Sequence, residues 1–387
     1  MKDLINYELK KIFEKKKVII FSLVTITLCI AIFLGRAYSL NTFNNLDRIK
    51  ESSAILVGEI TPEKIEPIEK LYAEFINTPE NFIEGEPGGE MQMKPEVKAE
   101  FDLLEHCLSM NNFDKLQKDD IKELENILKQ SNLELDEKLS IEKYIEMLKE
   151  KGNLHIGYNL FYDFSEYFST MSAPILGFLI IFFLSPVFSN EYTTNMDALI
   201  LSSKNGKKKI ILSKIIASII AITCIFILVI GTYNLVNAFV FGLEGGATSF
   251  TTLLYDPFIY MNSPYNLTML QYFLLSILIS YLGCLGLGAF TLFISSKVSN
   301  QLFATMINMA LFFIPLIMVG FLGYDSIVKF SYMSIMQVRP LFYDFSALVI
   351  FKNVVMTKDI ILILLSITTI VLGLLTFNSF RKHQVSN

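Results

Sequence analysis

The sequence predicts an all-α polytopic membrane protein with six transmembrane helices and a large helical extracellular insertion between the first two. Three observations support this fold class. Hydrophobic residues make up 52% of the 387 residues and charged residues only 18%, whereas soluble domains carry about 25% charged residues. Six apolar windows are each long enough to cross a hydrocarbon layer of about 30 Å. A long acidic segment with helically spaced apolar residues separates the first two windows.

The six spans are predicted from runs of about 20 apolar residues, since a helix rises about 1.5 Å per residue. They are residues 18–37, 171–189, 210–241, 269–294, 301–322 and 359–378. The third window is longer than a bilayer requires, which predicts a tilted or projecting helix. Residues 1–17 carry six lysines and apolar residues that can share one helix face. They predict a cytoplasmic amphipathic helix that lies in the membrane interface.

The lysine and arginine distribution predicts that both termini are cytoplasmic. The N-terminal segment, the loop at Lys207–Lys209, the short loop at Lys297 and the C-terminal tail are basic. Residues 242–268, on the other side, contain no Lys or Arg. An excess of positive charge marks cytoplasmic loops. The four basic segments alternate along the chain with the other connecting segments, as an even number of spans with both termini on one side requires.

Residues 38–170 form the predicted extracellular helical domain, with 28 Asp and Glu against 14 Lys and Arg. Four segments with helical apolar spacing predict a bundle; the first begins at Thr61-Pro62 and places Ile65, Ile68, Leu71 and Phe75 on one face. A flexible acidic loop is the alternative. The aromatic residues from Tyr158 to Phe168 precede the second span, and we expect them to be anchors at the membrane interface.

The sequence contains no nucleotide-binding GxxxxGK[ST] motif and no HExxH, GxSxG or Cys/His ligand cluster. We therefore expect no cofactor or metal on this chain. The central parts of the spans lack charged residues, which argues against an ion-coupled transporter. Uncharged polar residues such as Asn234, Asn237 and Asn308 predict hydrogen bonds between helices. Gly283, Gly286 and Gly288 predict close helix packing, with a dimer seam as the alternative.

Residues 190–209, between the second and third spans, have more features than a membrane anchor needs. Glu191 and Asp197 precede lysines at the end of a predicted short helix, an order that the helix dipole favours. Its apolar residues, including Leu199, need lipid or a partner groove.

Together with the N-terminal sequence LINYELKKIFEKKK and the outer insertion, this loop resembles permease subunits of ABC-2 type ATP-binding cassette exporters. The group includes lantibiotic-immunity and bacitracin-resistance permeases. Two details depart from the family pattern: Asn195 stands near a position where glycine is usual, and lysines replace arginine.

The resemblance implies a multi-pass protein of the bacterial plasma membrane that has no ATPase site of its own. ATP would be used by a cassette ATPase subunit, and a second permease chain would complete the export route for a peptide antibiotic or amphipathic drug. No nucleic acid is expected as a partner. Residues 171–387 contain the second to sixth spans with the coupling loop 190–209. Within this range, segment 323–358 resembles the re-entrant extracellular segment of family members. The implied ATPase-coupling residues are Glu191, Asp197, Leu199, Lys207, Lys208 and Lys209, and those of the interface helix are Glu8, Lys10 and Lys11.

Two other functions are alternatives. The chain would be a membrane-anchored sensor if its extracellular domain bound a peptide and its spans served only as anchors. It would be a membrane-embedded enzyme if polar residues converged near the outer face, with Asp163, Glu166 and Asp344 as candidates.

Overall fold

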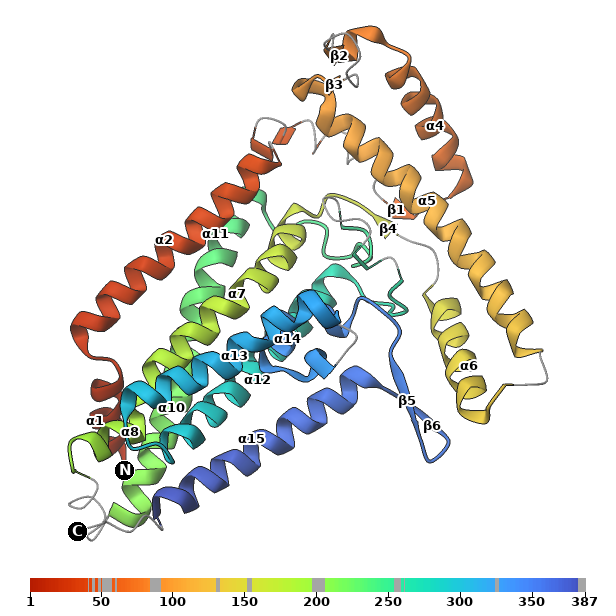
Figure 1. Cartoon of the computed structure of the whole chain (residues 1–387). Coiled ribbons are helices and arrows are strands. Elements are labelled where there is room, and N and C mark those ends of the chain that lie inside the picture. Colours follow the sequence, from red (N-terminus) through yellow and green to blue (C-terminus); the bar gives the residue numbers. More distant parts are fainter. Residues whose placement is uncertain are drawn as a thin grey trace.

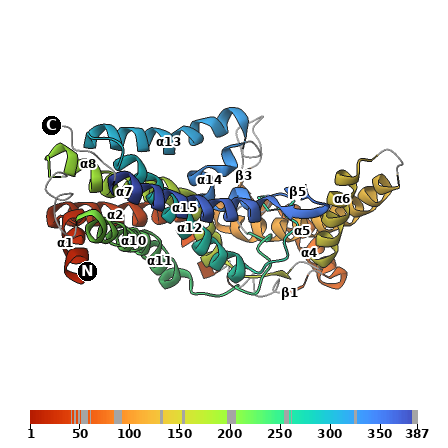
Figure 2. The ribbon, with the colours of Figure 1, turned by 90° about the horizontal axis from the view of Figure 1, so that it is seen from below.

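The computed structural model describes the chain except for residues 41, 44–45, 48–49, 51–57, 60, 84–91, 130–132, 152–154, 197–205, 254–258, 261, 324–326 and 382–387. Six helical segments in the described part are long and apolar enough to cross a membrane, as predicted. They form one bundle, and a helical insertion extends from one end of it (Figures 1 and 2). The protein is therefore membrane-embedded and mainly helical.

The spans run up and down the bundle in chain order. Their bounds are α2 (Lys15–Ser39), α7 and α8 (Leu160–Leu184 and Pro186–Thr193), α10, η3 and α11 (Ile211–Phe226, Ile227–Gly231 and Thr232–Phe241), α12 (Met269–Ser295), α13 (Gln301–Leu322) and α15 (Thr357–Arg381). The π-helical turn η2 (Gly206–Ile210) leads into α10. Side-chain caps fix two starts: Thr268 accepts a hydrogen bond from the Gln271 amide, and Asn300 accepts one from the Leu302 amide.

The N-terminal helix α1 (Lys2–Ile12) and the C-terminal end of α15 lie at the same end of the bundle (Figure 1). Helix α1 packs against α10. Phe380, at the end of α15, packs on Phe188 of α8 with ring centroids 5.0 Å apart. We call this end the terminal end and the opposite one the insertion end. The arrangement agrees with an even number of spans, and the cytoplasmic orientation stays a prediction.

The insertion is helical, and two of the separate helices that the sequence predicts for its described residues are joined. Its elements are β1 (Gly58–Glu59), α4 (Pro62–Ile76), η1 (Pro79–Asn81), β2 (Phe82–Ile83), β3 (Gln92–Met93), α5 (Pro95–Leu128), α6 (Leu135–Glu150) and β4 (His155–Ile156). The second and third predicted helices are one helix, α5, because the stretch between them has no Gly or Pro to end it. The antiparallel pair β1–β4 joins the two ends of the insertion.

The insertion is elongated and is not a compact bundle. α4 packs on the first part of α5 around a small buried cluster of Ile65, Ile68, Leu104, Cys107 and Met110. α6 lies along the last part of α5 (Figure 1), where Lys149 and Glu125 form an ion pair of 2.6 Å. Leu71, predicted for the core, is exposed, so the expectation of one shared core was wrong for this residue.

Segment 323–358 forms short elements that return to the bundle. They are η4 (Ile327–Phe330), α14 (Tyr332–Gln337), η5 (Arg339–Leu341) and the strands β5 (Ala347–Ile350) and β6 (Asn353–Met356). The hairpin β5–β6 was not predicted, and the re-entrant character of this segment stays a prediction. Gly283 of α12 permits the close approach of α14, because a Cβ there would lie 2.7 Å from Met336 Cγ.

The other two glycines of α12 also serve packing within the chain. A Cβ at Gly286 would lie 2.6 Å from Leu365 of α15, and one at Gly288 would lie 2.4 Å from Ile222 of α10. The default prediction of helix packing is thus confirmed, and the alternative of a dimer seam is wrong for these residues.

Most of the aromatic residues before the second predicted span are buried inside the bundle, whereas Tyr167 is half-buried. α7 begins at Leu160 instead of residue 171, and it buries Phe161, Tyr162, Phe164 and Phe168 in the bundle. The Phe168 ring stacks on Tyr233 of α11 with centroids 3.7 Å apart. Their interpretation as interfacial anchors was therefore wrong, because the loop after α11 and the neighbouring helices cover this part of α7.

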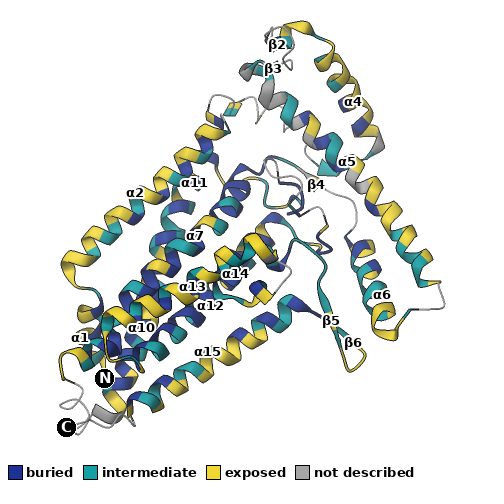
Figure 3. Cartoon of the chain, in the orientation of Figure 1, coloured by how far each residue is buried: buried dark blue, intermediate teal, exposed yellow. Residues whose placement is uncertain are grey.

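That loop packs closely on the backbone that precedes α7. Gly245 has φ +86, and a Cβ at this position would lie 2.0 Å from Tyr158 O, so only glycine fits. By contrast, α2, α13 and α15 carry broad exposed apolar faces (Figure 3). Such faces suit the hydrocarbon of a bilayer.

Candidate functional site

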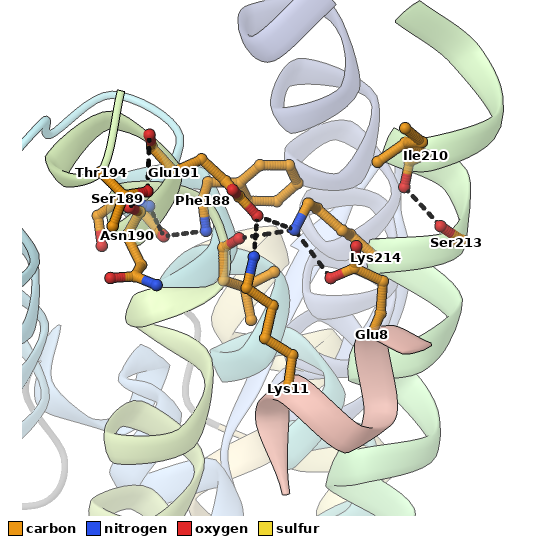
Figure 4. A network of polar contacts seen from close by, with 12 residues as sticks. Glu8, Lys11, Phe188, Ser189, Asn190, Glu191, Thr194, Ile210, Ser213 and Lys214 are labelled. Atoms are coloured by element: carbon orange, nitrogen blue, oxygen red, sulfur yellow. Dashed lines mark hydrogen bonds and ion pairs between the residues drawn. The ribbon is translucent and has the colours of Figure 1, made fainter. Parts of the chain in front are cut away.

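A buried group of charged side chains connects three segments at the terminal end. Lys214 of α10 donates hydrogen bonds to Glu8 Oε2 of α1 (2.8 Å), to Glu191 Oε1 of α8 (2.7 Å) and to Val187 O (3.2 Å). Lys11 Nζ of α1 lies 2.5 Å from the same Glu191 oxygen. Figure 4 shows these side chains converging from α1, α8 and α10. We call Glu8, Lys11, Glu191 and Lys214 the Lys214 network.

The Lys214 network is electrically balanced, with two carboxylates and two ammonium groups. The exposed fraction of the side chain is 0% for Lys214, 2% for Glu191 and 7% for Glu8. An ammonium group has three N–H donors, and all three of Lys214 have an acceptor. Such an arrangement offsets the large desolvation cost of buried charges only while it stays complete. The network therefore fixes α1, α8 and α10 relative to one another.

A second set of hydrogen bonds fixes α8 to the end of α12. Ser295 Oγ accepts from the amides of Phe188 (3.0 Å) and Ser189 (3.1 Å) and donates to Ser185 O (2.6 Å). Tyr192 donates to Ser296 O at 2.9 Å. The first amides of a helix have no partner within it, so Ser295 satisfies the start of α8. α8, which leads into residues 197–205, is thus held by the Lys214 network on one side and by the end of α12 on the other.

The structure places the predicted coupling residues in different environments. Glu191 is buried in the Lys214 network, so its carboxylate faces the interior of the bundle. Lys208 and Lys209 are exposed. Asp197 and Leu199 lie outside the described residues, and Lys207 belongs to η2 without a described side chain. The coupling role of this set stays a prediction.

The residues predicted for the interface helix also lie in different environments. Glu8 points into the Lys214 network, whereas Lys10 is exposed. Lys11 is partly exposed and reaches Glu191 with its ammonium group. The sequence did not predict the role of Lys214, because a lysine at the start of an apolar run is also typical of a membrane anchor. The sequence shows only that Glu191 and Lys214 flank the same loop between two spans, not that their side chains meet.

A second charged cluster lies at the insertion end. Glu166 of α7 accepts two parallel hydrogen bonds from Arg339 of η5, from Nε to Oε1 and from Nη2 to Oε2, both 2.8 Å. The Tyr260 hydroxyl donates to Glu166 Oε1 at 2.9 Å and lies 2.5 Å from the Tyr272 hydroxyl. Paired bonds between Arg and a carboxylate are strong and directional. We call Glu166, Arg339, Tyr260 and Tyr272 the Glu166 cluster.

Backbone strain accompanies the Glu166 cluster. Val338, directly before Arg339, has φ +62 and is fully buried. A β-branched residue in the left-handed region is a clear outlier, and the surrounding packing must hold it there. This strained residue separates α14 from η5 and directs Arg339 toward α7.

The cluster holds its groups in defined protonation states. Burial opposes the charge on Arg339, but the Glu166 carboxylate outweighs burial and raises the pKa of Arg339 above its ordinary value. Burial, and then the charge of Glu166, raises the pKa of Tyr260 well above its ordinary value. At neutral pH, Arg339 is charged and Tyr260 is protonated. Arg339 therefore neutralises the charge of Glu166, and Tyr260 donates a further hydrogen bond to its carboxylate.

Only one of the residues proposed for a membrane-embedded enzyme is in this cluster. Glu166 belongs to it, Asp163 is buried on the same helix, and Asp344 accepts a hydrogen bond from the Phe345 amide at 2.7 Å. Within the described part of the chain, no three His, Cys, Asp or Glu side chains gather as a metal site requires. The contacts of Glu166 tie elements together, which is a structural role.

The predicted hydrogen bonds between spans are present for the asparagines. Asn237 of α11 donates to Phe161 O (2.7 Å) and to Ser165 Oγ (2.9 Å) of α7. Asn308 of α13 donates to Ser185 Oγ at 3.3 Å. These bonds add to the contacts that hold α7 in the centre of the bundle. No family model, curated protein or solved structure matches the chain.

Proposed function

We propose that this chain is the membrane-spanning permease subunit of an ABC-type exporter and that a separate cassette ATPase drives it. The observation that carries the proposal is the Lys214 network. It joins α1, α8 and α10 at the end of the bundle that also holds Phe380 of α15 and the described residues on both sides of 197–205. A partner that moves this end moves all three segments together.

The mechanical part of the proposal follows from the chain path. Residues 190–209 connect α8 to α10, and Lys214 ties the same two helices together 2.7 Å from Glu191. α8 continues from α7, which reaches the Glu166 cluster at the insertion end. A displacement of the 190–209 segment by an ATPase would therefore be transmitted along α7 across the membrane. Glu191 would act as a positioning residue inside the bundle, and Leu199 as a direct contact.

The remaining parts of the proposal come from the family resemblance. The ATPase subunit would bind and hydrolyse ATP at the cytoplasmic face of the bacterial plasma membrane. A second permease chain, identical or homologous, would complete the export route. The proposed substrate, a peptide antibiotic or an amphipathic drug, likewise comes from the resemblance.

Purification in mild detergent tests the proposal. We expect a cassette ATPase to co-purify with the tagged chain, and its ATP hydrolysis to increase when the substrate is added. Leu199→Asp should reduce ATPase capture, whereas Glu191→Ala should lower the stimulation of hydrolysis more than capture. Glu69→Gln, an exposed change in the insertion, is the matched control. Normal stimulation and capture in both loop variants would refute coupling through this segment.

A membrane-anchored peptide sensor is the second candidate, and one contact favours it. The Tyr144 ring of α6 stacks on Phe345, just before the β5–β6 hairpin, with centroids 4.6 Å apart. The hairpin leads directly into α15, so the insertion is connected to the last span. Peptide binding by the insertion in a preparation that contains no ATPase would favour this function over transport.

A further inference from the structure

An open apolar groove with a basic rim lies at the terminal end, between α1, α2, α7 and α10. Its volume is about 610 Å³, within the usual size range of ligand pockets. Apolar residues such as Phe21, Phe183 and Leu228 line most of it, and Lys10 and Lys15 stand at its rim. From the structure we infer that this groove binds one anionic phospholipid, with the phosphate at the two lysines and an acyl chain along the apolar wall.

The charges around the groove support an anionic headgroup. Lys11 is engaged by Glu191, and Lys17 forms an ion pair with Glu14 of 2.7 Å. Lys10 and Lys15 have no ion-pair partner among the described residues. Two lysines that line the same groove without an ion-pair partner leave a local positive charge, and a phosphodiester supplies the complementary charge.

The direction of the groove supports a lipid over a free anion. Its lining on α2 extends from Lys15 to Thr25, about 15 Å along the helix axis. The lysines lie where the span begins, and the apolar part continues toward the middle of the span. A membrane lipid has the same order, with its charge at the interface and its chains inside.

The groove is also open toward the surface that faces the bilayer. Ile19 and Cys224, two of its lining residues, are exposed. Phe21 and Phe183, which both line the groove, pack with ring centroids 5.5 Å apart and form its aromatic wall. A lipid can therefore reach the groove from the bilayer side. This inference is independent of the proposed transport function.

Native mass spectrometry of the full chain in detergent tests the inference. Phosphatidylglycerol and phosphatidylcholine with identical acyl chains are the probes. We expect one phosphatidylglycerol to be retained per chain, and Lys10→Gln/Lys15→Gln to weaken its binding about 30-fold, the effect of two lysine contacts with anionic lipid. The control is Lys2→Gln/Lys16→Gln, which removes the same charge from exposed lysines outside the groove and should retain the lipid.

A second pair of variants tests the acyl-chain part of the groove. Cys224→Trp, or Ser22→Phe should the first variant not fold, fills the groove and should weaken both lipids. The inference is wrong if the two double-lysine variants retain phosphatidylglycerol equally, or if the filling variants change nothing. It is also wrong if phosphatidylcholine binds as tightly, or if millimolar glycerol phosphate displaces the lipid, since that result would indicate a free-anion site.

Discussion

Replacing Lys214 by methionine tests how strongly the Lys214 network holds the terminal end together. Methionine keeps the length of the side chain but removes the charge and all three hydrogen bonds. Glu8 then has no ammonium partner in the network, although its side chain is only 7% exposed. Breaking a buried ion pair by removing one partner costs about 3–5 kcal/mol. At about 2 °C per kcal/mol for a large chain, the melting temperature should fall by about 6–10 °C.

The double variant Glu8→Gln/Lys214→Met separates lost charge balance from lost volume. It leaves the Lys11–Glu191 pair intact and no unbalanced carboxylate, so we expect at least half of the loss in melting temperature to be recovered. The assay is thermal unfolding of the detergent-solubilised protein, followed by size-exclusion chromatography. Lys209→Met, at an exposed lysine of the same segment, is the matched control. A double variant no more stable than Lys214→Met would refute the argument from charge balance.

Three further predictions follow from the same structure. Arg339→Met should lower the melting temperature through the unpaired Glu166 carboxylate, and Arg339→Lys should recover only part of it, because lysine cannot form both parallel bonds. In a cysteine-free background of intact cells, an impermeant thiol reagent should label Glu123→Cys in the insertion but not Lys209→Cys, and the opposite result would invert the topology. In hydrogen–deuterium exchange, amides of α14 and η5 should exchange faster than those of α8, because the strained Val338 lies between these two short elements, and equal protection would contradict this reasoning.

Local signals in the sequence were sufficient for much of the membrane part. α12 and α13 begin within a residue of their predicted starts, because Thr268 and Asn300 are good N-caps next to long apolar runs. The start of α7 was predicted too late. Tyr158 to Phe168 is rich in aromatic rings, and only the folded chain determines whether such rings face lipid or other helices. That choice depends on long-range contacts such as Phe168 with Tyr233.

The candidate sites were harder to predict than the spans. The partners in the Lys214 network come from positions 8, 11, 191 and 214, and a single sequence does not show that they meet. The β5–β6 hairpin left a signal that was missed: Val and Ile are concentrated in 347–356 around the turn at Phe351 and Lys352. The continuous α5 was also readable, because nothing between its two apolar stretches ends a helix.

The two charged clusters differ in how easily they can open, and this difference bears on the proposed transport cycle. In the Lys214 network the ammonium group of Lys214 is fully enclosed, so opening it would leave buried charges without partners. In the Glu166 cluster the Glu166 side chain is also buried, at 3% exposed, but the Arg339 side chain is 27% exposed and sits in a short irregular segment next to strained Val338. Water can therefore reach Arg339, and releasing Val338 would return some of the cost of opening. If α7 tilts during transport, α1, α8 and α10 stay fixed to one another at the terminal end, and the bundle opens at the insertion end.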